Sequence, residues 1–150
     1  MPEAAARARR IIDSNQYLTL ATADADGRPW ASPVWFAHQD HKRFIWVSKP
    51  DARHSRNLAE RPEIALVVFD STLAIGTGDA LYAEAAAEQL DGPDVAGAIE
   101  VFSRRSLECG GRAWTADEVG RDALHRLYRA TASALFILGE NDERIPVDLA

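Results

Sequence analysis

The 150-residue sequence contains one cysteine, Cys109, and no long uncharged hydrophobic run. A single cysteine excludes an internal disulfide and a metal site built from several thiolates. No window approaches the roughly 18 uncharged apolar residues that a membrane-spanning helix needs. Residues 1–10 also lack the apolar centre of a secretory signal. We therefore expect a cytoplasmic protein with no membrane partner.

An excess of positive charge is also missing, because the formal net charge is −6. Proteins that bind nucleic acids usually present an excess of Lys and Arg to the phosphates, so nucleic acid is not an expected partner. One basic island stands out: residues 42–61 carry six Lys or Arg against two acids, whereas residues 62–103 carry no Lys or Arg. Such an island favours a site for one small anion, and a solvated helix face is the alternative.

Alternating hydrophobic residues predict strands in the first half of the chain. Residues 17–23 and 28–37 flank an Asp-Ala-Asp-Gly turn, which is typical of a hairpin. The return strand is apolar on both faces, so we expect a ligand or a partner subunit to cover one of them. Pro33 cannot donate to a ladder, which places it at a sheet edge or bulge.

The remaining elements follow from hydrophobic periodicity and from helix start and stop signals. Further strands are predicted at residues 44–48, 64–69, 73–75, 80–86, 134–138 and 144–149, and helices at 4–13, 52–60, 93–106 and 115–130. Hairpins dominate this order, so the predicted fold class is mainly β (α+β), an antiparallel barrel with helices packed outside, in a single domain covering residues 1–150.

The junction between the strand at 44–48 and the helix at 52–60 carries the strongest local signal for a site. We expect Asp51 to cap this helix. The first backbone N–H groups of a helix are unpaired and attract anions, and Arg53 and His54 fall in that first turn. Arg56 and Asn57 follow on the same side of the helix. The junction therefore predicts a phosphate site.

These segments together resemble the pyridoxamine phosphate oxidase-like family of FMN-binding split barrels. The resemblance rests on the order and spacing of residues 18–22 (Leu-Thr-Leu-Ala-Thr), 26–29 (Asp-Gly-Arg-Pro), 31–36 (Ala-Ser-Pro-Val-Trp-Phe), 53–58 (Arg-His-Ser-Arg-Asn-Leu) and 61–62 (Arg-Pro). It is clear from about residue 11 to residue 69 and loose thereafter. It implies a split β-barrel and a homodimer with FMN at the subunit interface.

The resemblance also implies a cofactor site. In the family, the stretch matching residues 32–35 lines the flavin ring, the strand end matching 47–48 approaches the ribityl-phosphate arm, and the positions matching 53–54 hold the phosphate. Together, the resemblance and the strand-to-helix junction give ten candidate cofactor-binding residues: Ser32, Pro33, Val34, Trp35, Val47, Ser48, Arg53, His54, Arg56 and Asn57.

Three positions depart from the family pattern. His54 stands where the family usually has Lys, so a permanent charge is replaced by a ring that titrates near pH 6.5 when unperturbed. Ala37 and Ser32 stand where the vitamin oxidases carry basic residues, and residues 141–148 lack their substrate-gripping Arg-x-His pattern. A specific vitamin oxidase is therefore not expected, and phosphate binding would depend on Arg53, with Arg56 as a candidate second cation.

The resemblance implies an FMN-dependent oxidoreductase that acts on an unknown small substrate, without an obvious catalytic acid or base. One alternative is a deazaflavin-dependent reductase of a related branch. A second is a flavin-binding or storage protein without turnover, and a third is an interaction domain whose pocket has decayed.

Four tryptophans are further candidates for stacking on a flavin. Aromatic residues in a small barrel are core residues by default, and we expect this of Trp30 and Trp46. Trp35 lies on the segment that matches the ring-lining strand and is expected beside the flavin. Trp114 follows the Cys109-Gly-Gly segment, and we do not expect it to close over the site.

Other motifs carry no predicted chemistry. His38, Asp40 and His41 have a spacing that would suit a metal, but they lie in a turn where such residues are ordinary, so we expect a surface turn and no metal site. Residues 76–79 lack the third glycine of a dinucleotide fingerprint.

Overall fold

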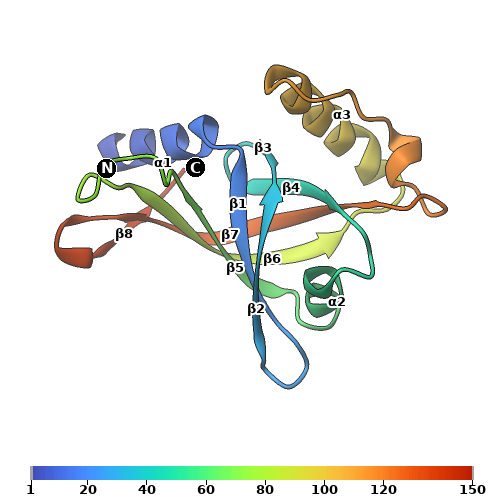
Figure 1. Cartoon of the computed structure of the whole chain (residues 1–150), viewed down its shortest axis with the longest axis horizontal. Helices are drawn as coiled ribbons and strands as arrows, with labels where there is room; N and C mark the ends of the chain where they lie inside the picture. The colour runs from blue at the N-terminus through green and yellow to red at the C-terminus, as the bar shows by residue number, and fades with distance from the viewer. Residues whose placement is uncertain (1, 150) are drawn as a thin grey trace.

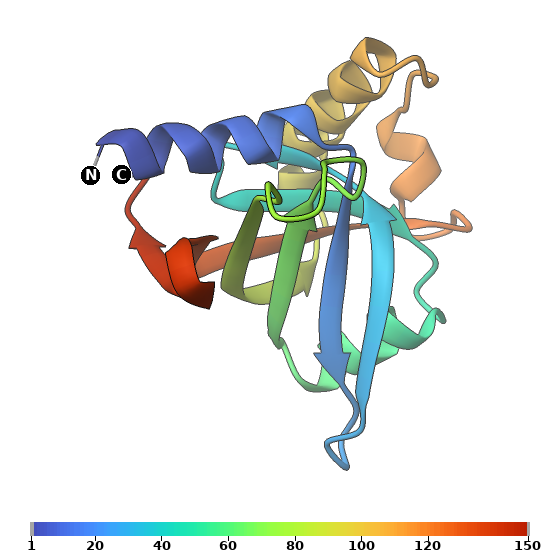
Figure 2. The ribbon, with the colours of Figure 1, turned by 60° about the vertical axis from the view of Figure 1, so that its left-hand side comes forward.

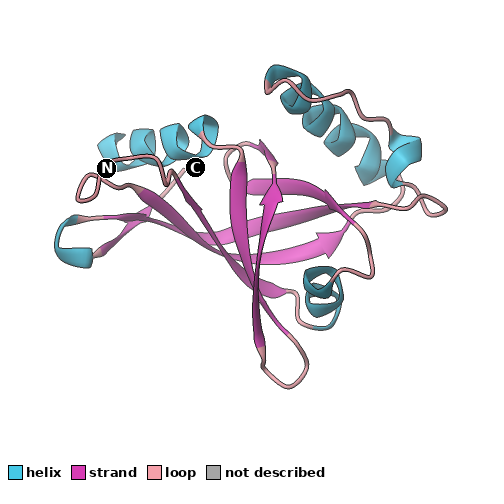
Figure 3. Ribbon diagram, in the orientation of Figure 1, coloured by secondary structure: helices cyan, strands magenta, loops and turns pink. Residues whose placement is uncertain are grey.

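The computed structural model describes residues 2–149 and folds them around one curled antiparallel sheet (Figures 1 and 3). The helices of this range are α1 (Pro2–Ser14), α2 (Arg53–Glu60), α3 (Pro93–Glu108) and the short 3-10 helices η1 (Ala116–Val119) and η2 (Glu140–Asp142). The strands are β1 (Tyr17–Ala23), β2 (Pro29–Trp35), β3 (Ala37–Gln39), β4 (Arg43–Ser48), β5 (Glu63–Phe69), β6 (Ala80–Gln89), β7 (Arg126–Leu138) and β8 (Arg144–Val147). The predicted antiparallel split barrel with flanking helices is confirmed.

The sheet opens between two strands that are consecutive in the chain. Its strand order is β2-β1-β5-β6-β7-β4-β3, and β8 pairs with β7. The predicted strand at 28–37 is therefore interrupted at Phe36, which is buried and packs against Phe44. Up to Trp35 the chain pairs with β1, and from Ala37 it pairs with β4. Pro33 lies on β2 at the edge of the sheet, as predicted.

The β1–β2 hairpin forms as the turn residues predict. The side chain of Asp24 accepts the backbone N–H groups of Asp26 and Arg28, each at 2.9 Å. Gly27 has a φ of 85°, a left-handed conformation that glycine adopts without steric cost. Seven residue pairs then align from Tyr17–Trp35 to Ala23–Pro29.

Two apolar clusters stabilise the fold. In the larger one, α1 lies across one end of the sheet (Figure 2) and buries Ile12 with residues such as Leu20 and Trp46 inside the barrel. In the other, α3 packs Ile99 and its neighbours over Ile45 and the start of β7. None of the α-helices in residues 2–149 is long and apolar enough to cross a membrane.

The prediction of a helix at residues 115–130 is wrong. Only η1 is helical there, and β7 begins at Arg126 and runs for 13 residues into the predicted strand at 134–138. Leu127, Tyr128 and Ala130 are buried in this strand, which pairs with β4 on one side and β6 on the other. Pairing on both edges of β7 outweighs the helical propensity of the segment.

Three smaller predictions also fail. Residues 73–75 form no strand: Ile75 is fully exposed, and the turn before it is fixed where Asp70 accepts the N–H of Thr72 at 2.9 Å. Asp51 does not cap α2, because the N-cap residue is Ala52 and the helix has no side-chain cap hydrogen bond. The strand expected to end near residue 86 continues to Gln89 along β7.

Candidate functional site

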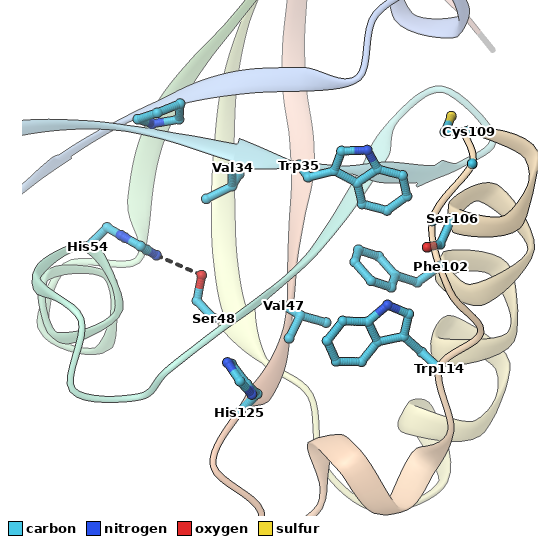
Figure 4. Close-up of a pocket in the computed structure, with 13 residues that line it drawn as sticks. Val34, Trp35, Val47, Ser48, His54, Phe102, Ser106, Cys109, Trp114 and His125 are labelled. Carbon is cyan, nitrogen blue, oxygen red and sulfur yellow. Dashed lines mark hydrogen bonds between the residues drawn. The ribbon is translucent and has the colours of Figure 1, made fainter.

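A cavity of about 550 Å³ opens between β2, β4, the start of α2 and α3 (Figure 4). Val34 and Trp35 contribute from β2, and Val47 and Ser48 contribute from the end of β4. The residues that line it are Pro33, Val34, Trp35, Val47, Ser48, His54, Phe102, Ser106, Cys109, Gly110, Gly111, Trp114 and His125. The cavity thus joins residues from 33–54 to residues from 102–125, which are up to about 90 residues apart in sequence.

Six of the ten residues proposed from sequence line this cavity: Pro33, Val34, Trp35, Val47, Ser48 and His54. Four do not. Ser32 is half-buried on β2, and Arg56 is exposed on α2. Asn57 is buried and donates its side-chain N–H to the hydroxyl of Thr22 at 3.0 Å, which ties α2 to β1. Arg53 is exposed, and its guanidinium lies 4.2 Å from the ring centroid of Trp30.

Trp30 does not lie in the core, contrary to expectation. Its side chain is 41% exposed on the edge strand, whereas Trp46 is fully buried as predicted. Most of β2 is exposed, so the apolar face that the sequence assigned to a ligand or partner is not covered within this chain. Arg53 packs on Trp30 instead, in a cation–π contact.

The polar end of the cavity lies where α2 begins. The Nε2 atom of His54 and the hydroxyl of Ser48 are 2.9 Å apart, which joins the first turn of the helix to the end of β4 (Figure 4). Burial lowers the pKa of His54 below its usual 6.5. Because Ala52 offers no capping side chain, the first N–H groups of α2 have no side-chain acceptor.

This depressed pKa predicts a stability loss on acidification. Below pH 6.5 the unfolded chain protonates His54 more readily than the folded one, so stability falls as the pH drops from above 6.5 through the folded pKa. Each unit of depression removes about 1.4 kcal/mol. Urea unfolding at pH 7.5 and pH 5.5 should show a larger loss for the parent than for His54→Gln. Equal losses would contradict the assignment.

Apart from Trp35, the opposite wall of the cavity was not predicted from sequence. Trp35 and Phe102 meet edge-to-face at 4.8 Å between centroids, and Phe102 meets Trp114 at 5.8 Å. Trp114 therefore lines the cavity, contrary to expectation. The helical spacing around Phe102 indicated only a buried face. No sequence signal placed His125, because its segment was assigned to a helix.

Trp114 is held in place by several contacts. Its backbone N–H donates to the hydroxyl of Ser103 at 2.9 Å, and the guanidinium of Arg112 lies 3.8 Å from its ring centroid. The chain reaches it by passing close to α3, where a Cβ on Gly111 would lie 2.5 Å from the hydroxyl oxygen of Ser106. The ring position is therefore preorganised.

A separate polar cluster joins α1 to the turn between β3 and β4. The Nε2 atoms of His38 and His41 lie 2.8 and 3.0 Å from the carboxylate of Asp13. Burial raises the pKa of Asp13, but bonds and charges from both rings outweigh it and the pKa is lowered. The Nδ1 atom of His38 accepts the N–H of His41, so its neutral ring carries the proton on Nε2. The three side chains thus link α1 to the turn through hydrogen bonds.

Similar folds occur among solved structures. A heme-binding protein from Mycobacterium smegmatis matches with a TM-score of 0.78 at 20% identity, over 99% of this chain and 59% of that one. A heme storage protein from Vibrio cholerae matches with a TM-score of 0.70 at 24% identity, over 86% of this chain and 90% of that one. At these identities the likeness shows the fold alone.

Sequence comparison is more specific. A pyridoxine/pyridoxamine 5'-phosphate oxidase from Streptomyces avermitilis is 33% identical over 64 residues, which are 43% of this chain and 29% of that protein. The chain thus matches less than a third of the oxidase's length. The model of the family described as pyridoxamine 5'-phosphate oxidase matches residues 4–135. The chain therefore belongs to the pyridoxamine 5'-phosphate oxidase family.

Proposed function

We propose that this cavity binds FMN and that the chain is an FMN-dependent oxidoreductase acting on a small molecule. The observation that carries the proposal is the composition of the cavity. Apolar side chains of Val34, Trp35 and Val47 line one part, and Ser48 and His54 lie beside the uncapped start of α2 at the other. FMN likewise has two unlike parts, a flat ring that would suit the apolar side chains and a phosphate that would suit the start of α2.

The residues present fit that cofactor. The apolar side chains would hold the ring and exclude water from it, and the hydroxyl of Ser48 would donate to the ribityl-phosphate arm. The free N–H groups at the start of α2 favour an anion, and Arg53 in the same turn would neutralise the phosphate. When bound, FMN supplies hydride or electron transfer, while the protein provides orientation and a pocket.

A homodimer with the cofactor at its interface is part of the proposal. Exposed β2, with Trp30 at 41% exposure, is the surface that a second copy would cover. A large apolar side chain on an edge strand favours such a contact. Because Val34 and Trp35 of the same strand line the cavity, a second copy seated there would add residues of its own to the site.

Heme is a second candidate, favoured by one observation. Two imidazoles, those of His54 and His125, line the cavity, and histidine is a common axial ligand of heme iron. Heme-binding and heme storage proteins share this fold, which is a further reason to test heme against FMN. A deazaflavin in place of FMN, or a flavin carrier without turnover, would also fit the cavity, because its apolar lining would hold either ring.

The absorbance spectrum of the purified protein tests the cofactor. We expect a flavin spectrum that persists through gel filtration, and a solution mass of two chains. Titration calorimetry with FMN, deazaflavin and hemin on the stripped protein should rank FMN tightest. Heme binding tighter than FMN, or no heat with FMN, would contradict the proposal. Turnover of reduced nicotinamide by the flavin-loaded protein would then separate an enzyme from a carrier.

A further inference from the structure

The cavity is lined by no side chain with a permanent charge. Of the 13 lining residues within the described chain, none is Asp, Glu, Lys or Arg. Its polar side chains include those of Ser48, His54 and His125. A charged substrate that left water for this space would find no fixed countercharge. Burying an uncompensated ion costs several kcal/mol or more.

Among the arginines that neighbour lining residues in sequence, Arg112 and Arg126 lie next to Gly111 and His125 and are held by other partners. Arg112 forms a 2.6 Å ion pair with Glu118 while it stacks on Trp114. Arg126 donates to the backbone carbonyls of Ala123 and His125. Both guanidinium groups therefore support the wall of the cavity, and neither lines it.

The α3 side of the cavity presents aromatic surface. Figure 4 shows Trp35 from β2 followed by Phe102 and Trp114 on the α3 side, across the space from Ser48 and His54. Their edge-to-face contacts hold each ring against rotation, so the wall is rigid. A flat, apolar molecule buries the most surface against such a wall at the least entropic cost.

We infer that the α3 side of the cavity binds an uncharged planar ring compound, and that Trp114 is the residue that determines this specificity. The inference rests on the proposed function, because the Ser48–His54 side is then occupied by FMN. It separates this chain from oxidases of phosphorylated vitamins, whose substrate carries a phosphate that the α3 side of this cavity would leave without a cation.

Titration calorimetry on the FMN-loaded protein tests the inference, with menadione as the uncharged ring and pyridoxamine 5'-phosphate as the charged one. We expect menadione to bind and the phosphate compound to give no measurable heat. Trp114→Ala should weaken menadione binding by about 10-fold or more, since a buried aromatic contact is lost. Trp114→Phe should retain most of the affinity.

Phe69→Ala is the matched control, because Phe69 is an exposed aromatic residue on β5 outside the cavity. It should leave menadione binding unchanged. If Trp114→Ala does not fold, His125→Arg tests the same idea by adding a cation to the wall, and it should create measurable binding of pyridoxamine 5'-phosphate.

The outcomes separate the two proposals. A protein that holds FMN but binds pyridoxamine 5'-phosphate more tightly than menadione overturns the inference and leaves the cofactor assignment standing. The same holds if Trp114→Ala binds menadione as tightly as the parent. A protein that takes up no FMN overturns the proposed function itself.

Discussion

Replacing Arg53 with alanine is expected to weaken FMN binding by about 10- to 100-fold. Hydrogen bonds to charged groups contribute about 1.5–3 kcal/mol, and about 1.4 kcal/mol corresponds to a tenfold change. Arg53 is the residue that begins α2, beside His54, whose lowered pKa keeps its ring mostly neutral at pH 7. The exposed contact with Trp30 leaves the guanidinium able to reorient towards a bound phosphate.

Titration calorimetry of FMN at low and high salt would measure this effect. Arg104→Ala is the matched control, because Arg104 is an exposed arginine on α3 whose ion pair with Glu100 lies outside the cavity. It should leave the FMN affinity unchanged. Of the two variants, only Arg53→Ala should show a weaker salt dependence of FMN affinity than the parent. Equal affinities of Arg53→Ala and the parent at low salt would show that the phosphate is held elsewhere.

The half of the cavity that faces α2 was predictable because its signals are local. Alternation and an Asp-Gly turn define the β1–β2 hairpin, and a strand followed directly by a helix places Ser48 near His54. Such relations depend on residues close together in the chain. Sequence periodicity and helix-start chemistry indicate the hairpin and the strand-to-helix junction. The family resemblance was needed to assign the six lining residues of these segments to one site.

The half that faces α3 depends on contacts between distant segments. Residues 126–130 have the composition of a helix, but they form a strand because β4 and β6 pair with them on both sides. With that strand misassigned, His125 had no position relative to the cavity. Trp114 likewise reaches the site through Ser103 and Gly111, whose proximity only the folded chain reveals.

This division has a functional consequence. The predicted phosphate site at the start of α2 lies in one half of the cavity, whereas the α3-facing half contributes most of the aromatic wall. Cofactor binding and substrate choice would then depend on separate elements of the chain. Substitutions on α3 should alter the preferred ring compound without changing FMN affinity.

The two tryptophans that the sequence assigned to the core should differ widely in their effect on stability. Trp46 is fully buried on β4, where it stacks on Tyr128 with 5.9 Å between the ring centroids. We expect Trp46→Ala to lower the free energy of unfolding by about 3–5 kcal/mol, a large part of the roughly 5–15 kcal/mol typical of a domain. Trp30→Ala removes only an exposed cation–π contact worth about 0.5–1 kcal/mol. Urea unfolding of both variants measures the difference, and similar losses would mean that Trp30 is buried in the protein in solution, as a subunit interface over β2 would make it.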